Sequence, residues 1–551
     1  MFKRVLSVCL AFAMLLLCSC SQTGSANSDD SSAVNNSNSD NSAQIEKFDA
    51  KLVINELFPT YAPARQVYAV DISELDVNTV AFLRQLQGLV AKTQTASVYL
   101  VSNESDKVWL DYVCNELGAY STTITAEQMV ALYGDLIESL VVYSSEHSEF
   151  YAAWNDAIRR ANAVCADYSV ALNFDLLENR EVINVHGVFN DVKNSYETLF
   201  SMADITEKAI WVSLDETSAF LDYAYACSAY ILPTVEDEWS TGLVENCLAN
   251  SNCDKLGIVY TDYSVNNNVL KLYSKCGFGN IAVAGFSNST TLSSIGVDYK
   301  FEKEKVHNST GKKGNIYVSL VIDSLYAGNV FVENYAVCKT KREDFCVAIE
   351  YPLFLSKLAP ATLLWYSINT KQTGDSIIPD GNWMSVDQDL LDEKLYMQWV
   401  QVNNSFIKSC GMSLAVTDSF KSGDAIPNYT DLNSSKGIVL YTAESLSGMY
   451  PAVSDTAIVF ATKLSTITEL ESSLQALVPD ESAPLYFVYS ISGEQYFDKI
   501  PIYDIYNGYY GEGEPDGYYA VNEIVALFLC QYPDKSYFVS PAQMIAHINK
   551  K

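Results

Sequence analysis

Apolar residues recur at helical and strand spacing along the chain from about residue 50 to its end. Residues 79–91 place Val80, Leu83, Leu86 and Val90 on one face, which predicts an amphipathic helix. Residues 106–117 show the same spacing and end at Gly118, a residue type that commonly closes helices. The first half of the chain also predicts a helix at residues 154–165 and strands at residues 97–101, 140–143, 168–172, 209–214 and 256–260.

Strand and helix patterns also alternate in the second half. The predicted helices are residues 386–410, residues 467–477 and a last one that begins at Pro541 with Ser540 as its cap. The predicted strands are residues 316–322, 345–349, 361–366, 413–417, 438–441, 457–461, 485–489 and 536–539. Such alternation is typical of α/β proteins with parallel sheets.

The number of strand signals favours two regions of different architecture. We expect an N-terminal α/β region at residues 49–300, followed by a C-terminal β/α barrel-like domain at residues 311–551. An open doubly wound sheet is the alternative to the barrel.

The N-terminus has the pattern of an export signal. Two basic residues precede an apolar run that is too short to span a membrane as a helix. Residues 17–20 (LCSC) resemble the lipobox of bacterial lipoproteins, in which Cys20 carries the lipid, and a plain signal peptide at residues 1–20 is the alternative. Residues 21–48 are mostly polar and predict an unstructured tether. We therefore expect a protein on the extracellular face of the bacterial cell membrane, held there through its lipid anchor only.

The charge balance narrows the possible partners. The chain has 67 Asp and Glu against 35 Lys and Arg, a formal net charge of −32, which excludes nucleic acid as a partner because phosphate binding needs a basic face. A glycan or another neutral polymer is compatible with this charge. Four histidines and the lack of any CxxC pair argue against a metal site, and no Walker or GxGxxG loop occurs, so we expect neither a metal nor a cofactor. The cysteines are expected to be buried thiols, with a disulfide between Cys247 and Cys253 as the alternative for that pair.

Several short segments carry a resemblance to a known family by their order along the chain. Residues 86–90 (LQGLV) are followed by residues 97–100 (SVYL), and residues 288–291 (NSTT) come later. Residues 317–323 (YVSLVID) and residues 352–366 (PLFLSKLAPATLLWY) complete the series. Together they resemble the GxGYxYP family of glycoside hydrolases over about residues 65–550. The resemblance implies a carbohydrate-active protein.

The sequence also departs from the family pattern. Residues 375–383 read DSIIPDGNW where the resemblance places the GxGYxYP signature, and the signature itself is absent. An acidic Asp-Gly-Asp-Asn cluster of the family is reduced here to Asp323 and a distant Asn329. The resemblance therefore implies a divergent member, and loss of catalysis is an open alternative.

Carboxylates that follow predicted strands are the candidates for catalysis. Two carboxylates suffice to hydrolyse a glycosidic bond, and in a β/α barrel the working residues lie beyond the carboxyl ends of the strands. Asp323 and Glu350 are the first candidates, since each closes an apolar strand, and Asp323 also matches the family's acidic cluster. Asp375 and Asp418 are further candidates in or near loops after strands. An exposed or helix-capping carboxylate is the alternative for each of them.

Asn329, Asn382 and Trp383 are the candidates for substrate binding. Asn329 is what remains of the acidic cluster, while Asn382 and Trp383 lie in the segment that replaces the signature, and an exposed indole is suited to stacking on a sugar ring. Trp365 lies in an apolar run, which favours the core. The Tyr- and Gly-rich residues 506–519 form either a ligand contact or a plain surface loop.

Two functions from different classes follow. The first is a cell-surface carbohydrate-active enzyme that uses two carboxylates. The second is a lipoprotein without catalysis that binds a glycan or a small solute. A structural adhesin is disfavoured, because we find no internal repeat in the sequence.

Overall fold

A computed structural model gives the fold of most of the chain. It describes residues 49–61, 65–93, 96–144, 147–185, 193–194, 196, 208–251, 255–295, 310–323, 345–380, 382–410, 414–417, 437–442, 457–497 and 516–548. All of these residues belong to one compact unit. Cys20 and the predicted tether lie outside the described residues, and the division into regions at 49–300 and 311–551 stays a prediction.

The first sheet has the strand order β2-β1-β3, and its pairs are parallel. The helix expected at residues 79–91 is confirmed as α3, which buries apolar side chains all round, and Gly118 ends α4 with a positive φ of 72°. The elements are α2 (Ala50–Leu57), β1 (Gln66–Asp71), α3 (Val77–Thr93), β2 (Ser97–Val101), α4 (Glu104–Leu117), β3 (Tyr120–Ile124), α5 (Ala126–Tyr133) and the short helix η1 (Gly134–Leu136).

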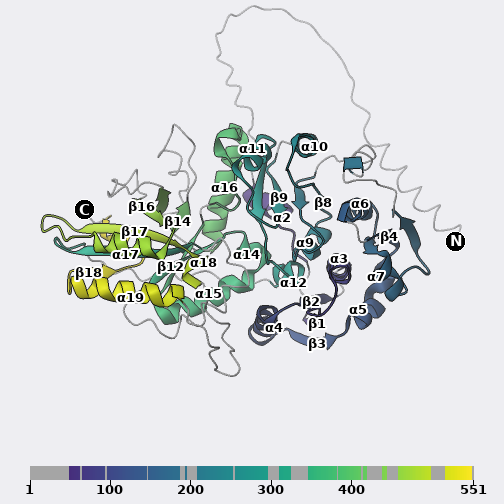
Figure 1. Cartoon of the computed structure of the whole chain (residues 1–551), viewed down its shortest axis with the longest axis horizontal. Helices are drawn as coiled ribbons and strands as arrows, with labels where there is room; N and C mark the ends of the chain where they lie inside the picture. Colours follow the sequence, from purple (N-terminus) through teal and green to yellow (C-terminus); the bar gives the residue numbers. More distant parts are fainter. Residues whose placement is uncertain are drawn as a thin grey trace, which may run out of the picture. The chain divides into compact units, whose positions relative to one another are not determined.

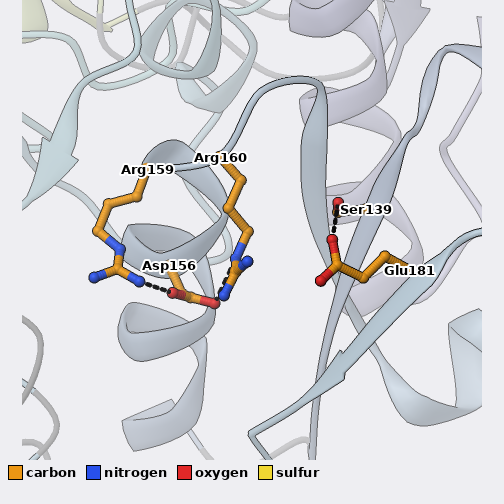
Figure 2. Close-up of polar contacts among 5 residues, drawn as sticks. All are labelled: Ser139, Asp156, Arg159, Arg160 and Glu181. Atoms are coloured by element: carbon orange, nitrogen blue, oxygen red, sulfur yellow. Dashed lines mark hydrogen bonds and ion pairs between the residues drawn. The ribbon is translucent and has the colours of Figure 1, made fainter.

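The second sheet has the order β5-β4-β6 and is also parallel. Asp156 lies in the last turn of its helix α6, where a negative charge opposes the helix dipole. Figure 2 shows Arg159 and Arg160 turned toward this carboxylate. Their N···O distances to it are 2.7 and 3.0 Å, and the two positive charges offset its negative charge. The elements are β4 (Ser139–Tyr143), α6 (His147–Ile158), β5 (Ala163–Asp167), α7 (Tyr168–Asn173) and β6 (Glu181–Asn184).

The third sheet follows the order β10-β9-β7-β8 with parallel pairs. Its core includes the buried Trp211, Val259 and Tyr273. Cys247 is a buried free thiol in this core, and Cys253 lies outside the described residues. The elements are β7 (Ile210–Ser213), α9 (Leu221–Ala226), β8 (Tyr230–Ile231), α10 (Glu238–Asn250), β9 (Gly257–Thr261), α11 (Asn267–Lys275), β10 (Phe278–Ala282) and α12 (Ser289–Ser294).

The C-terminal sheet has the order β13-β12-β11-β17-β16-β15-β14, and β18 pairs with β11. Its strands are parallel, and α17 and α19 pack side by side (Figure 1). The strands are β11 (Ile316–Asp323), β12 (Val347–Tyr351), β13 (Ser376–Pro379), β14 (Leu414–Thr417), β15 (Gly437–Thr442), β16 (Ala457–Leu464), β17 (Leu485–Ser492) and β18 (Ser536–Phe538). The helices are α14 (Leu355–Leu358), α15 (Pro360–Thr373), η2 (Gln388–Leu390), α16 (Glu393–Cys410), α17 (Ile467–Gln475), α18 (Gly493–Phe497), α19 (Asp516–Gln531) and α20 (Pro541–Ile548).

The predicted α/β class is confirmed. If β13 and β14 were adjacent, the strands from β11 to β17 would follow one another around a closed sheet in chain order. Residues of β13 and β14 do contact each other. In the described residues no hydrogen-bonded ladder joins β13 to β14, so a closed barrel stays a prediction. Within the same residues, no helix combines the length and apolar character needed to cross a membrane.

Three of the predicted elements were wrong. Residues 361–366 belong to helix α15, because Pro360 starts this helix and Gly374 closes it with a φ of 78°. Residues 154–165 are not one helix, since α6 ends at Ile158 and strand β5 begins at Ala163. Residues 168–172 lie in helix α7, whose first turn is capped by the Asp167 carboxylate. Short apolar runs do not distinguish a buried strand from a buried helix, and this ambiguity explains two of the errors.

Candidate functional site

Two nearly buried carboxylates lie next to each other at the carboxyl ends of β11 and β12. The register pairs Ile322 with Ile349, and Asp323 and Glu350 are the next residue on each strand. Adjacent strands lie about 5 Å apart, so the two backbones present these side chains at that spacing. Asp323 is 5% exposed and Glu350 is 8% exposed. The two first-ranked candidates of the sequence analysis are thus brought together.

An apolar layer lies beneath these carboxylates on the same side of the sheet. Side chains two residues apart on a strand point to the same side. Val321 and Ala348 precede Asp323 and Glu350 by two positions, and both belong to one buried cluster. Residues of α20, including Met544 and Ile545, complete that cluster. The sheet face is therefore apolar in its middle and acidic at its carboxyl end, as in α/β proteins that bind ligands at this edge.

Lys463 on β16 contacts the Asp323 carboxylate. Its ammonium nitrogen lies 2.7 Å from Oδ2 of Asp323, and its side chain is 45% exposed. Ala461, two residues earlier, belongs to the apolar cluster, so Lys463 reaches the carboxylate from the same side of the sheet. The ion pair holds Asp323 in a fixed position and gives the acidic edge a positive charge.

A small pocket lies beside Glu350, with a volume of about 60 Å³. One wall comes from the third sheet and the segment after β9, and the other from the ends of β12 and β13. A volume of this size accommodates about two water molecules or one polar substituent of a ligand. Its polar and aromatic lining residues are Ser264, Asn280, Glu350, Phe354, Asp380, Asn382 and Ser385.

Backbone hydrogen bonds join the two walls. The Asn280 N–H donates to the Ser385 carbonyl, and the Ser385 N–H donates to the Asn280 carbonyl, both at 2.9 Å. The Met384 side chain packs directly on Gly279, since a Cβ at this position would lie 2.4 Å from its sulfur. The third sheet is therefore part of the pocket.

The segment after β13 is shaped by Asp380. Its N–H donates to the Tyr351 carbonyl at 2.9 Å, which continues the pairing of β13 with β12. Its carboxylate accepts from the N–H of Asn382 at 2.8 Å, a local turn that brings Asn382 to the pocket. Asn382 was predicted as a binding residue, and it does line the pocket.

Two other sequence candidates lie elsewhere. Asp375 is at the amino end of β13, and its carboxylate accepts from the N–H of Val347, so it organises the opposite end of the strands from Glu350. Trp383 is 0% exposed and packs against Phe58 and Phe406, so its ring is a core element and cannot stack on a sugar. Sequence position alone could not distinguish a buried indole from an exposed one.

The remaining sequence candidates, Asp418 and Asn329, lie outside the described residues, as does most of the Tyr- and Gly-rich segment 506–519.

The structure adds Asp380, Asn280 and Lys463 to the site. Asp380 lies in the segment that replaces the family signature, so its position in the sequence could have indicated it as a site residue. Nothing in the sequence could place Asn280 or Lys463 there. No group of three or more His, Cys, Asp or Glu side chains in the described part of the chain is arranged to hold a metal ion.

Comparison with known families gives a match in the first part of the chain. Residues 66–135 match the model of the GxGYxYP_N 1st domain. We call this segment the GxGYxYP_N domain after the model that it matches. It runs from β1 almost to the end of η1 and contains both the LQGLV and the SVYL segments, so the resemblance seen in the sequence is confirmed there.

The fold is similar to that of a solved protein. The match is to "a putative hydrolase" from Bacteroides thetaiotaomicron VPI-5482, with a TM-score of 0.71 and 14% identity over 89% of this chain and 95% of that chain. It shows that the two share a fold. A second match, 4-alpha-glucanotransferase from Thermococcus litoralis, has a TM-score of 0.28 and 11% identity over 42% of this chain and 40% of that chain, too low to indicate a common fold. No curated protein matches the sequence.

The GxGYxYP_N domain is tied to the rest of the chain by its LQGLV segment. The Gln87 side chain donates to Oδ1 of Asn288 at 2.9 Å, and Asn288 also bonds both the N–H and the carbonyl of Leu100 on β2. Asn288 has a left-handed backbone with a φ of 57°, which asparagine tolerates better than most residues. Two segments of the family-like series, 201 residues apart, therefore meet in one buried network with a structural role.

A buried acid, Asp222 of α9, lies close to this network, with its carbonyl oxygen beside Gly88. Oδ2 of Asp222 accepts from the N–H and the hydroxyl of Thr290 at 2.9 and 2.7 Å. Burial raises the pKa of Asp222 from 3.8 to about 6, and the Thr290 hydrogen bonds and the charge of Arg84 oppose part of that increase. This acid lies on the interface between α3, α9 and α12 rather than at the pocket.

Proposed function

We propose that the protein is a carbohydrate-active protein of the bacterial cell surface that hydrolyses glycosidic bonds with Asp323 and Glu350. The observation that carries the proposal is the adjacency of these two nearly buried carboxylates at the carboxyl ends of β11 and β12. Two such groups are sufficient for the reaction, and this edge of the sheet is where α/β proteins place their chemistry. The GxGYxYP_N domain and the fold shared with a protein described as a hydrolase are consistent with it.

The surroundings of the two carboxylates suggest different roles. Glu350 lines the pocket, so in our proposal it donates a proton to the glycosidic oxygen. Asp323 is held in place by its ion pair with the Lys463 ammonium, so we assign it the role of nucleophile.

One observation favours the alternative of a binding protein without catalysis. The pocket beside Glu350 has a volume of only about 60 Å³, which admits part of a sugar and not a whole ring. In that case the same residues bind a neutral glycan or solute, and the carboxylates accept hydrogen bonds from its hydroxyl groups.

We further propose that the chain is lipidated at Cys20 and held on the outer face of the cell membrane. The support is the residue pattern of the N-terminus, where residues 17–20 resemble a lipobox and a polar stretch follows. The membrane contact in this proposal is the lipid alone.

A paired assay of binding and hydrolysis on a panel of neutral polysaccharides tests the function. We expect Glu350→Gln and Asp323→Asn each to lower the hydrolysis rate by at least about 100-fold while binding is kept. Glu181→Gln, which removes a carboxylate on β6, is the matched control and should act like the wild type. Binding without turnover by the wild type would support the alternative, and neither binding nor turnover would rule out both functions.

A further inference from the structure

The most exposed large hydrophobic side chain among the described residues belongs to the residue that directly precedes a pocket-lining serine. Tyr263 is 77% exposed, and the next residue, Ser264, lines the pocket. The hydroxyl of Thr261, the last residue of β9, donates to the Tyr263 carbonyl at 2.6 Å and fixes the turn after the strand. The aromatic ring is thus presented to solvent from a well-defined backbone position.

The side chains around the pocket offer complementary groups for a polyhydroxylated ligand. Glu350 and Asp380 provide carboxylate acceptors, and Asn382 provides an amide that both donates and accepts. The pocket, at about 60 Å³, has room for a hydroxyl or hydroxymethyl group but not for a sugar ring. A ring whose substituent enters the pocket must therefore remain outside it, at the rim.

A tyrosine at the rim is suited to such a ring. Its face is apolar and its hydroxyl is polar, so it can cover the C–H face of a sugar and still bond water or a sugar hydroxyl. The Glu350 and Asp380 carboxylates in the pocket disfavour anionic ligands, as does the net charge of −32 of the whole chain. A neutral sugar satisfies both the polar pocket and the exposed ring.

We propose that Tyr263 is the stacking platform of a sugar-binding subsite at the rim of this pocket. The subsite makes the third sheet a direct contributor to glycan recognition, because Tyr263, Ser264 and Asn280 all belong to it or to the turn after β9. The proposal rests on the proposed function, since it names residues that would bind the same class of ligand.

The test measures the binding of soluble neutral oligosaccharides, namely gluco-, manno-, galacto- and xylo-oligosaccharides, to the full-length protein by calorimetry. We expect Tyr263→Ala to weaken the affinity at least 10-fold, and Tyr263→Phe and Tyr263→Trp to retain it, because the flat ring supplies the contact. Tyr120→Ala is the matched control, since Tyr120 is 58% exposed on β3 of the first sheet, and neither it nor its chain neighbours line the pocket.

Two outcomes would overturn the inference, and they differ in what else they affect. If the wild type binds an oligosaccharide and Tyr263→Ala binds it equally well, the subsite is wrong and the proposed function stands. If the wild type binds none of the four classes and hydrolyses no neutral polysaccharide, the subsite and the proposed function both fail. A circular dichroism spectrum of each variant establishes that the exposed substitution leaves the fold intact.

Discussion

At the scale of single residues, the surroundings of a carboxylate decide what it contributes. Asp375 and Asp222 are both buried, yet Asp375 accepts a backbone N–H at a strand end, while Asp222 lies between helices with a pKa raised to about 6. Asp323 instead has an ammonium group at 2.7 Å. Three acidic residues of similar burial therefore have different roles. Asp375 fixes a strand end, Asp222 packs between helices, and Asp323 belongs to the candidate site.

Asp222 should make stability depend on pH in a direction opposite to that of most carboxylates. Between pH 4 and 6 the unfolded chain ionises this group and the folded chain retains the proton, so its contribution to the free energy of unfolding falls as pH rises. The difference between pKa values of 3.8 and about 6 corresponds to about 3 kcal/mol at neutral pH. We expect Asp222→Asn to gain stability relative to the wild type on going from pH 4 to pH 7, measured by urea unfolding.

Asp480 gives the control of opposite sign. Hydrogen bonds from Ser482 lower the pKa of Asp480 from 3.8, so Asp480→Asn should lose stability relative to the wild type as pH rises from about 2 to about 4, below the window in which Asp222 acts. If the free energies of unfolding of Asp222→Asn and the wild type differ by the same amount at pH 4 and at pH 7, the raised pKa of Asp222 is contradicted.

At the scale of elements, α3 is held by its close approach to α9. This helix shows the apolar spacing expected from residues 79–91, and it is buried on nearly every side. The spacing predicted the helix but not its neighbour, because α9 follows more than a hundred residues later. The same limit explains α15, whose apolar residues fit a strand equally well until Pro360 and Gly374 are read as its ends.

Gly88 is the position at which this helix contact can be tested. A Cβ there would lie 2.4 Å from the Asp222 carbonyl oxygen, a backbone atom that cannot move aside without shifting α9. We expect Gly88→Ala to lower the free energy of unfolding by about 1 to 3 kcal/mol, measured by chemical denaturation. Gly242→Ala in α10 is the matched control, since nothing lies within 4 Å of its Cβ, and it should raise stability by about 0.5 to 1 kcal/mol. If Gly88→Ala and Gly242→Ala change the free energy of unfolding equally, α3 and α9 do not approach each other as closely as described.

At the scale of the whole molecule, the candidate site combines parts that the sequence shows separately. Asp323 and Glu350 could be predicted because each ends an apolar strand, and parallel strands bring such ends together. The contribution of Asn280 could not, because it depends on its pairing with Ser385 across more than a hundred residues. Long-range contacts of this kind leave no periodic signal in the chain.

The N-terminal pattern leads to a prediction about the intact protein in its cell. We expect the wild type to incorporate a labelled fatty acid and to sediment with membranes, while Cys20→Ala should do neither and appear in the soluble fraction. Cys18→Ala is the control and should behave like the wild type. A wild-type protein that carries no lipid would refute the anchor and leave the site on the folded unit unaffected.

The hydrogen bonds of Asn288 have a consequence for any attempt to produce the GxGYxYP_N domain alone. A protein that stops at residue 135 lacks the side chain that bonds both polar groups of Leu100, and it exposes the face of α3 that α9 covers. Such a fragment would carry an incomplete strand edge and an apolar helix surface, two features that promote aggregation. We therefore expect the smallest soluble fragment to extend at least to residue 295, well beyond residue 135, where the family match ends.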